Sequence, residues 1–143
     1  MRTVKRSALV PYSTVQMYDI INDIEGYPSF LPWCVDSEVL FASETEQVAR
    51  LDLARGGLAQ SFTTRNRLSP PLGMTLELVE GPFTALSGTW ALQALGDEGC
   101  KISMEIHFEF NSRMMNAALS QIFTGVIDKM VEAFCRRADQ LHG

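Results

Sequence analysis

The last part of the chain contains a long segment without proline that carries one continuous helical pattern, RMMNAALSQIFTGVIDKMVEAFCRRADQL over residues 113–141. Its apolar side chains recur at helical spacing and form one broad stripe: Met115, Leu119, Ile122, Phe123, Val126, Ile127, Met130, Phe134, Ala138 and Leu141. At about 1.5 Å per residue, such a helix spans on the order of 40 Å. An apolar face of that length must be covered, and a whole β-sheet is long enough to cover it.

The preceding residues, 35–110, are punctuated like antiparallel strands. Turn-forming residues interrupt them at Gly56-Gly57, Ser69-Pro70-Pro71, Gly81-Pro82 and Gly96-Asp97-Glu98-Gly99. Between residues 102 and 110, apolar and polar side chains alternate strictly. This alternation is typical of a sheet with one covered face and one wet face. We therefore expect about six strands here, with the C-terminal helix on the covered face.

The first 34 residues add a strand and two short helical pieces. Residues 3–10 have strand character, and Pro11 ends them. Ser13 followed by Gln16 predicts a capping box at the start of a helix. The next stretch, EGYPSFLPWC over residues 25–34, is rich in apolar side chains, but its two prolines exclude a long helix or a central strand. The fold class predicted is α+β: a single domain, 1–143, with a curved antiparallel sheet of about seven strands around a long C-terminal helix.

The composition restricts the function classes that remain. The formal net charge is −5 and the pI about 5.0, which speaks against DNA binding through bulk charge. Cys34, Cys100 and Cys135 lie far apart and lack metal-ligand or CxxC spacing, so we expect a reduced, cytoplasmic protein. The N-terminus lacks the apolar core of a secretion signal, and no apolar run reaches membrane-spanning length.

Three motifs in this order resemble those of a known protein group: Tyr27-Pro28-x-Phe30-Leu31-Pro32-Trp33-Cys34, Val79-Glu80-Gly81-Pro82-Phe83-x-x-Leu86-x-Gly88-x-Trp90, and Phe108-x-Phe110. The chain resembles the START-like helix-grip proteins, and within them the polyketide cyclase/dehydrase-like group of ribosome association toxins and coenzyme Q-binding proteins. The resemblance implies an apolar cavity between the sheet and the C-terminal helix. It also implies non-catalytic binding of ubiquinone or a related lipid in support of respiration. The implied alternative is a toxin that binds the large ribosomal subunit and blocks subunit association.

Several side chains are candidates for the lining of that cavity: Tyr27, Phe30, Leu31, Trp33, Phe62, Asn66, Trp90, Phe108, Met115, Phe123, Gly125 and Ile127. The aromatics of residues 25–34 can form its mouth and contact a ligand or, transiently, a membrane surface. Asn66 is a polar amide on a covered face, where it either hydrogen-bonds to nearby backbone or meets a ligand oxygen. Gly125 either allows close packing or leaves room for a ligand. For all of them, ordinary core packing is the alternative.

A second set of candidates lies on the wet face of the sheet. Arg50, Arg65 and Arg67 are expected on the outer side of neighbouring strands, either as a solvated surface or as a docking patch for ribosomal RNA. The sequence contains no nucleophile-and-base motif, phosphate loop or zinc spacing, so we expect no catalytic residue, no metal and no required cofactor. A cyclase-like enzyme remains a second alternative, because such catalysis can rely on shape and a single acid or base.

Overall fold

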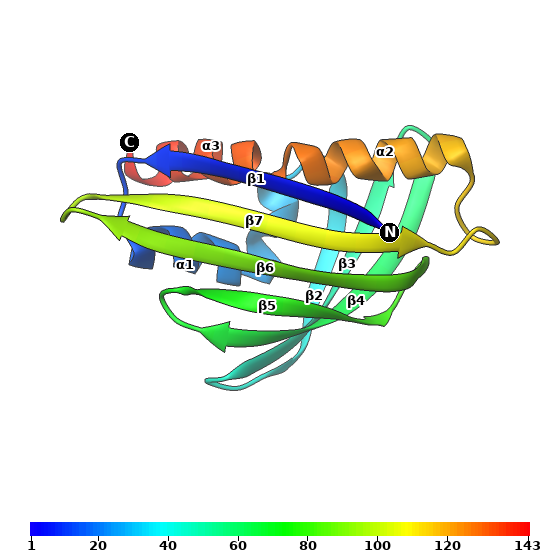
Figure 1. Cartoon of the computed structure of the whole chain (residues 1–143), viewed down its shortest axis with the longest axis horizontal. Coiled ribbons are helices and arrows are strands. Elements are labelled where there is room, and N and C mark those ends of the chain that lie inside the picture. Colours follow the sequence, from blue (N-terminus) through cyan, green and yellow to red (C-terminus); the bar gives the residue numbers. More distant parts are fainter.

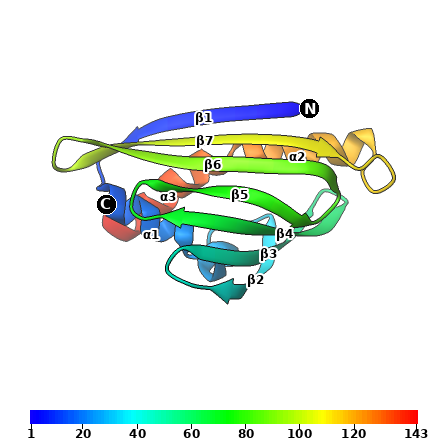
Figure 2. The ribbon, with the colours of Figure 1, turned by 60° about the horizontal axis from the view of Figure 1, so that its bottom comes forward.

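The computed structural model describes residues 1–143 as a seven-stranded antiparallel sheet with all helices on one face (Figures 1 and 2). The strand order across the sheet is β1-β7-β6-β5-β4-β3-β2. The elements are β1 (Arg2–Val10), α1 (Thr14–Asn22), the short 3-10 helix η1 (Ile24–Ser29), β2 (Cys34–Ala42), β3 (Glu46–Arg55), β4 (Leu58–Ser69), β5 (Gly73–Glu80), β6 (Phe83–Leu95), β7 (Gly99–Phe110), α2 (Ala117–Asp128) and α3 (Met130–His142). The predicted helix-grip class is confirmed, and the predicted turns fall at strand ends.

The capping box predicted at the start of α1 is present. The backbone N–H of Gln16 donates to the Ser13 hydroxyl at 3.1 Å, and the Ser13 N–H donates to the Gln16 side chain at 2.9 Å. Residues 24–29 then form η1, which accommodates Pro28. Backbone bonds fix the rest of this stretch: Leu31 N–H donates to Tyr27 at 2.9 Å, and Ala54 N–H donates to the Trp33 carbonyl at 3.0 Å. The stretch is therefore anchored to β3.

The C-terminal helical segment differs from the single helix that its pattern predicts. Residues 113–116 are not helical, and Asn116 caps α2 by accepting the Leu119 N–H at 2.9 Å. The helix is interrupted at Lys129, whose N–H donates to Val126 at 3.3 Å, three residues back, rather than to Gly125. Gly125 carries the carbonyl that Lys129 would bond in a continuous helix. Because a glycine inside a helix costs about 1 kcal/mol relative to alanine, Gly125 weakens the helix just before the break. The break lets α2 and α3 follow the sheet as two shorter helices (Figure 1).

The core lies between the helices and the inner face of the sheet. The alternation in β7 is confirmed, because Ile102, Met104, Ile106 and Phe108 are all buried. Phe134 of α3 packs edge-on against Tyr27, Phe30 and Trp90, with ring centroids 5.2–5.5 Å away. A second aromatic group joins α2 to the far end of the sheet and consists of Phe62, Phe83, Phe108, Phe110 and Phe123. None of the helices is both long and apolar enough to cross a membrane.

Candidate functional site

An interior cavity of about 60 Å³ lies between the sheet and the helices. Most of its lining is apolar: Ile24, Tyr27, Ala49, Leu51, Phe62, Thr64, Asn66, Met74, Leu76, Leu86, Trp90, Ile106, Phe123, Ile127 and Met130. A water molecule occupies about 30 Å³ in the liquid, whereas ligand pockets usually measure about 300–1,000 Å³. The cavity is therefore where the helix-grip fold predicts it, but it is much smaller than the volume expected for a lipid site.

Half of the cavity residues named from the sequence are in its wall. Tyr27, Phe62, Asn66, Trp90, Phe123 and Ile127 line it. Leu31, Phe108 and Met115 are buried in the core but do not line the cavity. Phe30, Trp33 and Gly125 line hollows on the outer surface of the helices instead. Gly125 is solvent-exposed, and a Cβ atom added there would meet nothing within 4 Å, so this glycine does not enlarge the interior.

The sequence-based assignment missed a further part of the wall: Ile24, Ala49, Leu51, Thr64, Met74, Leu76, Leu86, Ile106 and Met130. Period-two alternation does place most of the strand residues of this set on the covered face. It does not show which of them border a void and which touch another side chain, because that depends on how the helices sit over the sheet. The missing signal is therefore tertiary, not local.

The polar lining of the cavity comes from Thr64 and Asn66 on β4, and Gln47 on β3 bonds to Asn66 from outside the cavity wall. Gln47 and Asn66 stand opposite each other in the β3–β4 register, and the Asn66 amide donates to Gln47 Oε1 at 2.9 Å. The Thr64 hydroxyl donates to Asn66 Oδ1 at 2.7 Å. All three side chains are at most 8% exposed. Asn66 is thus partnered by side chains, which satisfies it without a ligand.

Tyr27 connects this cavity to the proline-rich stretch. Its ring lines the cavity, and its hydroxyl donates to the Ile21 carbonyl at 2.5 Å. Burial, the largest cause, raises the pKa of this phenol far above its ordinary value. Tyr27 therefore stays protonated and acts as a hydrogen-bonded wall, not as an acid or base.

The arginines named from the sequence lie on the outer face, and each pairs with carboxylates. Arg50 contacts three of them, Glu38 at 2.8 Å, Asp52 at 3.1 Å and Asp36 at 3.4 Å. Arg65 pairs with Glu46 at 2.6 Å, and Arg67 with Glu77 at 3.3 Å. Carboxylates outnumber arginines in this group, so the local charge is negative and disfavours phosphate.

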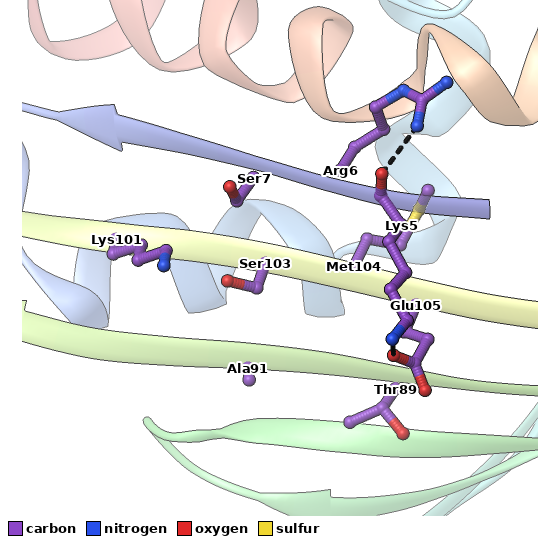
Figure 3. A pocket seen from close by; sticks show the side chains of 9 residues that line it. All are labelled: Lys5, Arg6, Ser7, Thr89, Ala91, Lys101, Ser103, Met104 and Glu105. Carbon is purple, nitrogen blue, oxygen red and sulfur yellow. Dashed lines mark hydrogen bonds and ion pairs between the residues drawn. The ribbon is translucent and has the colours of Figure 1, made fainter.

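A hollow of about 440 Å³ lies on the outer face of β1, β6 and β7 (Figure 3). Figure 3 shows Lys5 and Glu105 pointing toward each other across it, and their charged atoms are 3.1 Å apart. Beside it, the His107 ring lies between Glu105 at 2.8 Å and Thr3 at 2.9 Å. Bonds from His107 and then Lys5 lower the pKa of Glu105. Of Thr3, Glu105 and His107, only Glu105 lines the hollow, and its carboxylate is already bonded to Lys5 and His107.

Other chemically reactive groups are also sparse. Burial raises the pKa of the Cys34 thiol to about 11, and it raises the pKa values of Cys100 and Cys135 as well. All three thiols are free, and at neutral pH they remain protonated and are poor nucleophiles. No group of three or more His, Cys, Asp or Glu side chains is arranged to hold a metal ion.

The family model and the similar proteins described below agree on one family for this chain. Residues 10–135 match the model of the family described as polyketide cyclase/dehydrase and lipid transport. The chain is 45% identical over 140 residues to the ribosome association toxin RatA of Pseudomonas aeruginosa, covering 98% of this chain and 97% of that protein. It is 37% identical to the protein of the same name from Escherichia coli, covering 99% and 90%. A Xenopus laevis mitochondrial coenzyme Q-binding protein, COQ10 homolog B, is 28% identical over 96% of this chain and 58% of its own length.

Solved structures show the same fold at low identity. The Zhui aromatase/cyclase from Streptomyces sp. R1128 superposes with a TM-score of 0.83 at 19% identity, covering 97% of this chain and 94% of that one. A START superfamily protein from Mycobacterium smegmatis gives a TM-score of 0.80 at 19% identity, covering 97% and 98%. These structures support the helix-grip architecture alone, because this fold carries unrelated functions.

Proposed function

Because the chain belongs to the polyketide cyclase/dehydrase and lipid transport family, and because its full-length relatives are ribosome association toxins, we propose that it binds a ribosomal subunit and prevents the two subunits from joining. The observation that carries this proposal is the 45% identity to the Pseudomonas aeruginosa protein over 97% of that protein's length. Two features of the molecule support it. The interior cavity, at about 60 Å³, is small for a lipid ligand. The hollows on the outer surface of the helices, in contrast, are accessible to a large partner.

The proposed role is non-catalytic and needs no cofactor. The buried thiols are protonated, the Tyr27 hydroxyl is used in a backbone bond, and the Glu105 carboxylate in the hollow on the outer sheet face is paired with Lys5 and His107. The similarity to an aromatase/cyclase at 19% identity concerns the fold and carries no reaction over to this chain. Binding to a macromolecular partner is therefore the function that these surfaces support best.

Ribosome profiles test this proposal directly. Purified protein is added to separated ribosomal subunits, the magnesium concentration is raised so that they join, and the mixture is sedimented through a sucrose gradient. We expect the peak of joined ribosomes to fall with increasing protein, while the free-subunit peaks grow and the protein sediments with one of them. Unchanged subunit association at every salt concentration tested would contradict the proposal. A heat-unfolded sample of the same protein is the control.

A second candidate function is binding of an isoprenoid quinone or related lipid in the interior cavity. The observation that favours it is an apolar cavity with the amide of Asn66 in its wall, in a chain that also resembles a coenzyme Q-binding protein. With a volume of about 60 Å³, the cavity must expand before it can admit a quinone ring, and outward movement of α2 or α3 is the simplest route. Ligand binding would then depend on conformational change.

Lipid extraction tests this second function. Protein is purified without detergent from a host that makes ubiquinone, and its organic extract is examined by mass spectrometry. If the cavity holds a quinone, the extract contains it in about equal amount to the protein. Added quinone at 100 times its dissociation constant then stabilises the fold by about 2.7 kcal/mol, which is visible as a higher melting temperature. An empty extract together with an unchanged melting temperature would exclude this function.

A further inference from the structure

A basic groove runs along the outside of the helices beside the proline-rich stretch. Two hollows of about 290 Å³ each share Trp33, Arg55 and Lys129 in their walls, so they form one continuous surface, which we call the Trp33 groove. The groove is built from the loop before β2, the β3–β4 turn, α2, the break between the helices, and α3. Its lining consists of Phe30, Pro32, Trp33, Arg55, Gly56, Gln121, Ile122, Gly125, Val126, Lys129, Ala133, Arg136, Arg137 and Gln140.

The charge of this groove is opposite to that of the chain as a whole. Arg55, Lys129, Arg136 and Arg137 line it, and no Asp or Glu does, although the chain has a formal net charge of −5. Arg55 and Lys129 make no ion pair, unlike the arginines on the outer face of the sheet. Arg136 pairs only with Glu132 at 3.2 Å, and both side chains are about two-thirds exposed. Such an exposed pair is weak, so Arg136 is free to exchange partners.

The walls of the Trp33 groove are held in place before anything binds. Trp33 is 5% exposed, and its carbonyl accepts the Ala54 N–H, which fixes the loop to β3. The Arg137 guanidinium lies 5.2 Å from the centre of the Phe30 ring, a cation–π arrangement. Fixed walls reduce the ordering cost of binding.

Two glycines keep the floor of the groove low. Gly56 adopts a left-handed conformation with φ of +56°, and a Cβ atom there would lie 3.3 Å from the side chain of Ile122. Gly125 faces open space, so it lowers the helix surface between the hairpin and Lys129. Gly125, which is unusual inside a helix, therefore lines this surface groove and not the interior cavity.

We propose that the Trp33 groove binds the phosphodiester backbone of folded ribosomal RNA, an assignment that rests on the ribosome-binding function proposed above. Arginine and lysine side chains without carboxylate partners bind phosphate oxygens well, and arginine can do so through two hydrogen bonds. Trp33 is too buried to stack on a base, so the contact reads the backbone and not the sequence. Around Arg50, Arg65 and Arg67 the outer sheet face carries more carboxylates than arginines, so that part of the sheet repels RNA and the groove is the better phosphate site of the two.

Two triple variants with the same change in charge test the groove. The groove variant carries Arg55→Gln, Lys129→Gln and Arg136→Gln, all at exposed positions. The sheet variant carries Arg65→Gln, Arg67→Gln and Lys101→Gln, which are exposed on the outer face. Circular dichroism and melting temperature verify that both are folded. Binding is measured to purified ribosomal subunits and, separately, to a duplex RNA, as a function of salt.

The groove variant is expected to bind subunits about ten- to a hundredfold more weakly, and its log–log salt slope is expected to drop by about two to three, one for each lost phosphate contact. The sheet variant is expected to bind like the natural protein. Equal binding by the groove variant, or a loss confined to the sheet variant, would overturn the assignment. A photoreactive residue at Gln121 identifies the partner: cross-links to RNA support the proposal, and cross-links only to ribosomal protein overturn it.

The duplex RNA arm separates this inference from the proposed function. If the natural protein binds no subunit but binds duplex RNA through the groove, ribosome association is wrong and the phosphate-binding groove stands as an RNA site. If subunits are bound and the groove variant binds them normally, ribosome association stands and the groove assignment is wrong. If the natural protein binds neither subunits nor duplex RNA, both are wrong.

Discussion

Replacing Phe134 with alanine is expected to lower the free energy of unfolding by about 3–5 kcal/mol, the usual cost of removing a buried phenylalanine. Phe134 has no exposed surface, and its ring touches the edges or faces of Tyr27, Phe30 and Trp90. These partners come from the proline-rich stretch and from β6, so Phe134 joins α3 to both. The substitution removes apolar contacts and three aromatic pairs together, and the fixed proline loop limits how far the surroundings can collapse.

Equilibrium unfolding in urea measures this effect, and Leu141→Ala on the same helix is the matched control. Leu141 belongs to the apolar stripe by sequence but is 51% exposed, so its truncation is expected to change stability by no more than about 0.5 kcal/mol. A loss below about 1 kcal/mol for Phe134→Ala would mean that α3 packs more loosely on the sheet than its buried aromatic contacts indicate.

This contrast between Phe134 and Leu141 shows what the sequence can predict. The stripe of residues 113–141 correctly predicts helices packed on a sheet, and the alternation of residues 102–110 correctly predicts which face of β7 is covered. Both signals are local, because a helix or a strand repeats its environment at a fixed period. Leu141, at the end of the stripe, is exposed although it continues the same period, and no local pattern contains that information.

The same limit applies to the candidate site. Arg50 lies opposite Glu38 and bonds it, and Arg67 pairs with Glu77 two positions along β5. These pairings depend on strand register, which the alternation alone does not provide. The Trp33 groove combines a loop, a hairpin turn and a helix break that are far apart in the chain. Within the groove, Gly56, Gly125 and Pro32 are the residues that the sequence marks as disfavoured in regular structure.

Replacing Asn66 with alanine is expected to lower the free energy of unfolding by about 2–3 kcal/mol, because two buried polar groups lose their partner. The Gln47 side-chain oxygen would lose its 2.9 Å bond, and the Thr64 hydroxyl its 2.7 Å bond. Neither side chain can turn toward bulk water, since both are at most 8% exposed. The cost therefore exceeds that of removing one exposed hydrogen bond.

A double-mutant cycle with Gln47→Ala isolates the pair. If Asn66 and Gln47 stabilise each other, the two single losses do not add, and the coupling amounts to about 1 kcal/mol or more. Additive losses would show that water replaces the missing amide in the cavity. The same variants also bear on the second candidate function, because Asn66 lines the cavity. A quinone that bonds this amide would stabilise the natural protein more than Asn66→Ala, whereas a purely structural Asn66 leaves any quinone-induced rise in melting temperature unchanged. The difference between these two shifts separates an amide that organises the core from one that also meets a ligand.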